Sequence, residues 1–196
     1  TGSITITGLK GGHSSSGIVS AQANGIISAG TAGNITLLTD TISLNAANNV
    51  VSVGSLTIAP YSNGTMAVGT TGSTLNISDT YLGYLSAASY IFGSSASGNM
   101  TVNTATNFNT KNVTFISGTG DITVSSAYTS MGNGSLTLSA YRNIYNNAAI
   151  TLAGGALLER ADNSDATSNG TGVGICGGIY VGANISTTGG PSTLGE

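Results

Sequence analysis

Gly33-Asn34-Ile35-Thr36-Leu37 and Gly54-Ser55-Leu56-Thr57-Ile58 are two copies of the five-residue phrase that decides the fold of this chain. In each copy a glycine is followed by a small polar residue, an apolar residue, threonine and a second apolar residue. This alternation with a period of two predicts a β-strand with one buried face, and the glycine and polar residue before it suit a corner. The phrase recurs at residues 2–6, 98–102, 120–124 and 134–138, with looser copies at 73–77 and 148–152.

The spacing of the phrases predicts a repeat architecture. Copies beginning at Gly33 and Gly54 are 21 residues apart, and a period of about 20–50 residues is typical of solenoids and related folds. One phrase buries too little surface to form a core, so each must stack on an equivalent phrase one period away. We therefore expect an all-β parallel β-solenoid with coils of about 21 residues, formed by residues 1–196 as a single segment. Its inner ladder is expected to contain Ile35, Leu56, Leu75, Met100 and Ile122, with the threonines aligned outside.

Two segments depart from the pattern. Residues 79–93 mix helical and strand spacing, so we expect a short helical turn first and a strand from Ser89 to Phe92 at the end. Residues 159–171 concentrate charge and asparagine, and we expect them to form a loop that protrudes from the solenoid.

The composition narrows the classes of function. Only 6% of the 196 residues are charged and the net charge is -3, so the surface should be solvated mainly by serine, threonine and asparagine. The four bases, Lys10, Lys111, Arg142 and Arg160, are dispersed along the sequence, which argues against a nucleic-acid partner. No apolar stretch reaches the roughly 18 residues of a membrane-spanning helix. Because the chain begins at Thr1 without a secretion signal, we read it as a piece of a longer exported protein.

Candidate catalytic and metal-binding residues are few, and the sequence favours a structural role for each. His13 precedes three serines, but a nucleophilic triad would need a carboxylate from another coil, and a solvated turn is the simpler interpretation. The one acidic cluster, of the kind that a polysaccharide-cleaving enzyme would require, consists of Glu159, Asp162 and Asp165 beside Arg160. Because the cluster lies in the expected loop, an exposed charged loop is the favoured interpretation. Gly118–Ile122 matches only half of a calcium-binding repeat. Gly170–Gly174 lacks the strand, helix and downstream acid of a dinucleotide-binding motif. We predict no catalytic, cofactor-binding or metal-binding residues.

Aromatic, cysteine and asparagine residues leave further alternatives open. Tyr81, Tyr84, Tyr128, Tyr141 and Tyr145 could stack against sugar rings, although stacking inside the coils is the favoured role. Cys176, the one cysteine, is expected to be a small buried rung. Glycosylation sequons occur at Asn34, Asn63, Asn76, Asn99, Asn112, Asn133, Asn169 and Asn184, mostly as chance expects in such a composition.

The phrases resemble those of filamentous-haemagglutinin-like exoproteins of two-partner secretion systems. Gly33–Leu37, Ser43–Ala47 and the ordered series within residues 54–103 carry this resemblance, which covers about residues 2–155. It implies a right-handed parallel β-helix, export to the bacterial cell surface and attachment to other surfaces. The secretion domain of that family carries an Asn-Pro-Asn motif that is absent here, since only Asn24-Gly25-Ile26 is similar to a fragment of it.

These features together predict a non-enzymatic, secreted adhesin or shaft segment that attaches to glycans or proteins of host or neighbouring cells. The first alternative is a filament subunit that self-associates end to end through open β-helix edges. An ice-binding solenoid ranks lower because Thr5-Ile6-Thr7 is not repeated at a fixed spacing, and a polysaccharide-processing enzyme ranks with it.

Overall fold

The protein is built almost entirely of short parallel β-strands. The computed structural model describes residues 2–8, 18–31, 33–104, 108–161 and 177–195. Every strand pair within these residues is parallel. The all-β prediction is thus confirmed, and the arrangement is compatible with a β-solenoid.

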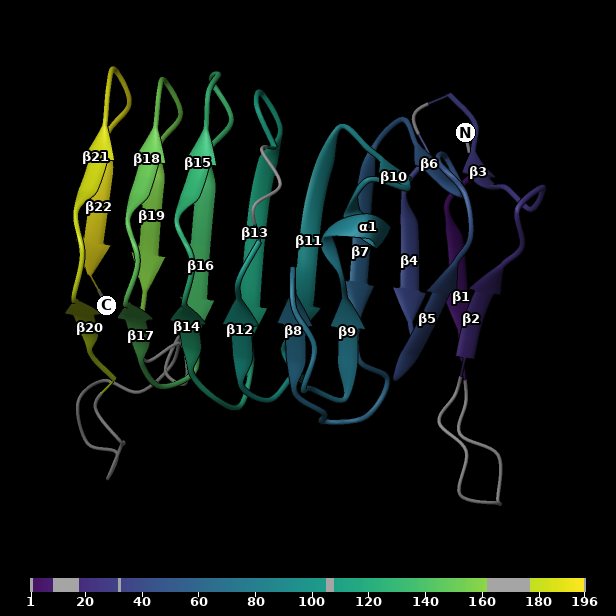
Figure 1. The fold of residues 1–196 in the computed structure, drawn as a ribbon, viewed down its shortest axis with the longest axis horizontal. Helices are drawn as coiled ribbons and strands as arrows, with labels where there is room; N and C mark the ends of the chain where they lie inside the picture. Colours follow the sequence, from purple (N-terminus) through teal and green to yellow (C-terminus); the bar gives the residue numbers. More distant parts are fainter. Residues whose placement is uncertain (1, 9–17, 32, 105–107, 162–176, 196) are drawn as a thin grey trace.

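The largest sheet has eight strands that lie side by side along the long axis of the molecule, with β1 at one end and β22 at the other (Figure 1). Its strands, in spatial order, are β1 (Ile4–Thr7), β4 (Ile35–Leu38), β7 (Ser55–Ala59), β11 (Ser89–Ser94), β13 (Asn112–Ser117), β16 (Leu136–Ala140), β19 (Leu157–Arg160) and β22 (Ser192–Gly195).

Between consecutive strands of the large sheet, the chain contributes strands to four smaller sheets. The six-stranded sheet contains β20 (Ile179–Val181), β17 (Ile144–Asn146), β14 (Ile122–Val124), β12 (Met100–Val102), β8 (Met66–Val68) and β9 (Leu75–Ile77). Two three-stranded sheets contain β10 (Leu85–Ser86), β6 (Val50–Ser52) and β3 (Ile27–Ala29), and β15 (Tyr128–Ser130), β18 (Ile150–Leu152) and β21 (Ile185–Thr187). The two-stranded sheet pairs β2 (Ile18–Ala21) with β5 (Thr41–Leu44).

The predicted period holds for some coils and not for others. Register partners in the large sheet are 21 residues apart at Ile35 and Leu56, and again at Leu136 and Leu157. Leu56 and Tyr90, however, are 34 residues apart, because β9 and the helix α1 (Asp79–Leu82) are inserted between them. The predicted turn at the start of residues 79–93 and the strand at their end are both confirmed.

The predicted single inner ladder is wrong, because its members belong to two sheets. Ile35 and Leu56 are partners in the large sheet, whereas Leu75, Met100 and Ile122 belong to the six-stranded sheet, with Met66 between Leu75 and Met100. The phrase marks a strand that follows a corner, and both sheets contain such strands. Its local pattern therefore cannot tell one face of the stack from another.

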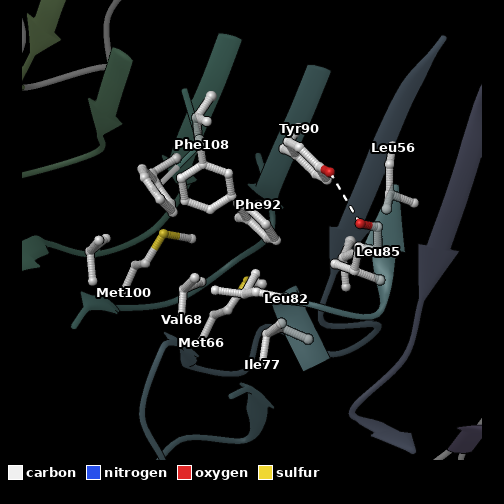
Figure 2. Packing of buried hydrophobic residues seen from close by; sticks show 14 of the residues in the cluster. Leu56, Met66, Val68, Ile77, Leu82, Leu85, Tyr90, Phe92, Met100 and Phe108 are labelled. Atoms are coloured by element: carbon white, nitrogen blue, oxygen red, sulfur yellow. Dashed lines mark hydrogen bonds between the residues drawn. The ribbon is translucent and has the colours of Figure 1, made fainter. Parts of the chain in front are cut away.

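One apolar core runs between the sheets and includes a group of aromatic rings. Phe92 stacks on Phe115 with ring centroids 5.5 Å apart, and Phe108 stacks on Tyr128 at 6.0 Å. Figure 2 shows Phe92, Phe108 and Tyr90 packed beside Met100 and Leu82, with the Tyr90 hydroxyl donating a 3.4 Å hydrogen bond to the carbonyl of Leu85. The stacking of equivalent inward side chains supplies the burial that one coil lacks.

The inserted strand β9 depends on two glycines in the connection from β8. Gly69 and Gly72 have φ values of 84° and 103°, which lie in the left-handed region that favours glycine. A Cβ at Gly69 would also lie 2.2 Å from the carbonyl oxygen of Asn103, whereas one at Gly72 would meet nothing within 4 Å.

These surroundings predict different costs for the two alanine substitutions. Gly72→Ala should lower the free energy of unfolding by about 1 kcal/mol through backbone strain alone. Gly69→Ala should lower it clearly more, by about 3 kcal/mol, because the backbone at Asn103 must also move. Urea unfolding of both variants measures the difference, and equal costs would contradict the close approach of the two coils.

Candidate functional site

Glu159, the one acid of the expected cluster that the structure describes, does not lie in a surface loop. Glu159 and Arg160 belong to β19, so the expectation that the loop begins at Glu159 is wrong. Glu159 is fully buried and Arg160 is exposed, because successive residues of a strand point to opposite faces. Asp162 and Asp165 lie outside the described residues, as do His13, Cys176 and residues 170–174.

Glu159 instead faces an asparagine across the core. Asn146 Nδ2 donates hydrogen bonds of 2.9 and 3.0 Å to the two carboxyl oxygens of Glu159. Burial raises the pKa of Glu159, and the hydrogen bonds from Asn146 offset part of that rise. The Oδ1 atom of Asn146 is buried and has no hydrogen-bond partner among the described residues. Such an enclosed carboxyl group has no route to a polysaccharide substrate.

Asp121, in the segment similar to half a calcium motif, belongs to a polar cluster at the start of three neighbouring strands, β12, β14 and β17. Its Oδ2 atom forms an ion pair of 3.2 Å with Arg142 Nη2, and its Oδ1 atom accepts hydrogen bonds from the backbone and side chain of Asn143. Arg142 also donates to Asn99. Among the described residues, no group of three or more His, Cys, Asp or Glu side chains could hold a metal ion.

After several corner glycines, and at Asn112 after Lys111, a polar side chain links its strand to the neighbouring strand of the same sheet. Asn34 Oδ1 accepts a hydrogen bond from the backbone N–H of Ser55, and Asn99 Oδ1 accepts one from Asp121. Asn112 Oδ1 accepts the N–H of Ser135 in the same way. The sequence signal for this role is the polar residue at the second position of the phrase. The pattern by itself predicts only a turn residue there.

We expect Asn99→Ala to lower the free energy of unfolding by about 0.5–1.5 kcal/mol. The substitution removes the acceptor of the Asp121 N–H and of Arg142 Nη2. Asn147→Ala is the matched control, since this exposed side chain forms no hydrogen bond with the described residues, and its cost should stay within about 0.5 kcal/mol. Equal costs in thermal or urea unfolding would show that the corner bonds do not hold adjacent coils.

Threonines line the outward face of the large sheet, as the alternation predicted. Thr5, Thr36 and Thr57 are register partners on three successive strands. The column continues through Ile91, Thr114, Thr137, Leu158 and Thr193. The positions two residues further along the strands are mixed: Leu38 pairs with Ala59, which is buried, and Ile116 pairs with Ser139. On the described strands this surface is therefore one column of threonines, interrupted at Ile91 and Leu158, without a second column beside it.

The tyrosines divide between the core and the surface. Tyr128 is buried against Phe108 and Phe115, and burial raises its pKa. On the outside, the rings of Tyr145 and Tyr180 stack 4.9 Å apart, and Tyr180 was not singled out in the sequence. Tyr81 and Tyr84 are half-buried near α1, and Tyr141 is exposed. The sequons at Asn34, Asn63, Asn99, Asn112, Asn133 and Asn184 are exposed, Asn76 is half-buried, and Asn169 lies outside the described residues.

No helix in the described part of the chain is long and apolar enough to cross a membrane. Comparison with known proteins found no matching family model, no matching curated protein and no matching solved structure.

Proposed function

We propose that this chain is a right-handed parallel β-helix that forms a structural shaft segment of a secreted bacterial surface adhesin. Its work is mechanical: it holds a stiff, weakly charged surface away from a cell and presents that surface for attachment to glycans or proteins of other cells. It performs no catalysis. The resemblance of its phrases to haemagglutinin-like exoproteins points the same way.

The continuous register of the large sheet carries this proposal. Eight parallel strands share backbone hydrogen bonds from β1 to β22, so bending the stack would strain many ladders at once. Corner hydrogen bonds that the side chains of Asn34 and Asn99 accept from backbone N–H groups add links between coils. The one acidic residue of the expected catalytic cluster that lies in the described residues, Glu159, is enclosed in the core, which disfavours the polysaccharide-enzyme alternative.

A self-assembling filament subunit is the second candidate, favoured by the side chains of the last coil. Tyr180, Val181 and Leu194 on β20 and β22 are each about half exposed, and Ile18 and Ile26 are exposed near the other end. Strand edges with apolar side chains pair readily with further strands. Another coil, from the same polypeptide or from a second molecule, would cover these side chains and pair with these strand edges equally well.

Electron microscopy of the purified chain with sedimentation velocity tests the proposal and separates it from the alternative. A shaft segment should appear as short monomeric rods that adhere, when immobilised, to cells or to arrayed glycans. Long regular fibres would favour the filament subunit. Compact round particles would contradict both, because neither a shaft nor a filament can be built from a shape without an axis.

A further inference from the structure

We propose that the hollow between β5, β9 and α1 is a binding subsite for a neutral sugar residue. This inference rests on the proposed adhesive function and gives it a place and a ligand class. The hollow has a volume of about 350 Å³, at the lower end of the usual range for ligand pockets. Its lining includes Asp40, Thr41, Thr74, Asn76, Ser78 and Tyr81.

The hollow exists because the stack is interrupted here. The inserted strand β9 forms the edge of the six-stranded sheet, and β5 belongs to a separate sheet with β2. β5 and β9 contact one another without ladder hydrogen bonds. The helix α1 follows β9 after a single residue, Ser78, which caps it by accepting the Tyr81 N–H at 3.2 Å. A break in the ladder therefore leaves a concave surface beside an aromatic ring.

Asp40 is the residue that most clearly points to a ligand. It is only 5% exposed, and its Oδ1 atom is held by hydrogen bonds from the Ser62 backbone at 3.0 Å and the Ser62 hydroxyl at 2.9 Å. Its Oδ2 atom accepts no hydrogen bond from the described residues. This oxygen is not enclosed, since the buried side-chain atoms without a partner among the described residues are Arg142 Nε and Asn146 Oδ1. A ligand hydroxyl can therefore reach it and donate a hydrogen bond.

The other lining groups are preorganised for a polyhydroxylated ligand. The Asn76 amide is fixed by two hydrogen bonds with the backbone of Ser73, at 3.0 and 2.8 Å. The hydroxyl groups of Thr41 and Thr71 have no partner among the described residues, so each can donate and accept. The half-buried ring of Tyr81 offers an apolar face, on which the C–H face of a pyranose can pack.

The charge of the site favours a neutral sugar over the other ligands that oxygen atoms can bind. Among the described residues that line the hollow, Asp40 is the one acidic side chain and none is a lysine or arginine, so this lining disfavours a sialic acid or a phosphate. A calcium ion would need six to eight oxygen ligands, and a single carboxylate provides too few charges to hold it. Vicinal sugar hydroxyls that donate to Asp40 form charge-assisted hydrogen bonds.

A nuclear magnetic resonance titration of the ¹⁵N-labelled whole chain tests the subsite. The probes are glucose, galactose, mannose and N-acetylglucosamine, with N-acetylneuraminic acid as the charged comparison. At least one neutral sugar should shift amides of residues 40–42 and 71–81 saturably, and the acid should not. Neutral sugars that leave these amides unmoved, or that shift only those near Tyr145 and Tyr180, would overturn the site.

Variants separate recognition from folding. Asp40→Asn keeps the acceptor for Ser62 and replaces the free oxygen by an amide, so affinity for the bound sugar should fall about tenfold or more while the amide spectrum elsewhere is unchanged. Asp121→Asn is the matched control on a different surface and should bind normally. Unchanged sugar affinity in Asp40→Asn would overturn the subsite even if the chain forms adhesive rods, whereas round particles that still bind sugar through Asp40 would overturn the shaft alone.

Discussion

Replacing Phe92 by alanine is expected to lower the free energy of unfolding by about 3–5 kcal/mol. The ring is fully buried and lies between two others, with centroids 6.0 Å from Tyr90 and 5.5 Å from Phe115. Its removal leaves a cavity between three coils, and stacked strands cannot collapse into it without breaking their ladders. Urea unfolding followed by circular dichroism gives the change.

The neighbouring substitution Ile91→Thr provides the control. Ile91 points outward from the same strand and interrupts the threonine column between Thr57 and Thr114. Threonine retains the branched shape that suits a strand, so its cost should stay below about 1 kcal/mol. A cost for Ile91→Thr as large as that of Phe92→Ala would contradict the assignment of inward and outward faces.

The second large effect is expected at the buried pair of Asn146 and Glu159. Asn146→Val removes the donor of both hydrogen bonds to the carboxyl group and should cost about 1–3 kcal/mol. The double variant Asn146→Val with Glu159→Leu should recover this loss or exceed the parent stability. The replacements match the register neighbours, since Val124 and Val181 flank Asn146 and Leu138 and Leu194 flank Glu159.

A double-mutant cycle from unfolding curves of the parent, both single variants and the double variant measures the coupling. If the two single costs simply add, the side chains do not interact, and the facing arrangement of β17 and β19 is wrong.

The same pair makes stability depend on pH in a defined direction. Burial raises the folded-state pKa of Glu159 above its usual value near 4.5. The folded chain therefore binds this proton more tightly than the unfolded chain does, and the resulting stability is fully present below the unfolded-state pKa. It is lost as the pH rises through the folded-state pKa. Glu159→Gln should consequently be more stable than the parent at neutral pH, with the advantage disappearing in acid.

The sequence predicted the strands well because alternation is a local property. The phrases at Gly33 and Gly54 fall on β4 and β7, and the expected helical turn and following strand fall on α1 and β11. The sequence did not predict which sheet each strand joins, because this depends on the number of residues between successive corners. The insertion of β9 and α1 lengthens the spacing between β7 and β11 to 34 residues. The phrases at 98–102 and 120–124 fall on β12 and β14 of the six-stranded sheet, whereas the phrase at 134–138 falls on β16 of the large sheet.

The polar features of interest were harder to predict because they depend on long-range stacking. Glu159 was placed in a loop for its charge, although the alternation Leu157-Leu158-Glu159 puts it at an inward position. Asn146 occupies the same kind of position in β17, and the two together were a detectable signal. Asp40 carries no such signal, since the donors of its hydrogen bonds belong to Ser62, which is 22 residues further along the chain.

The claim on which the rest depends is that parallel strands from successive coils lie in continuous register around one core. Interstrand nuclear Overhauser effects in the isotopically labelled chain test it most directly. We predict contacts between backbone protons of β4 and β7 near Ile35 and Leu56, of β7 and β11 near Leu56 and Tyr90, and of β11 and β13 near Tyr90 and Val113. Antiparallel contacts between strands adjacent in sequence, such as β4 with β5, would contradict the stacked arrangement.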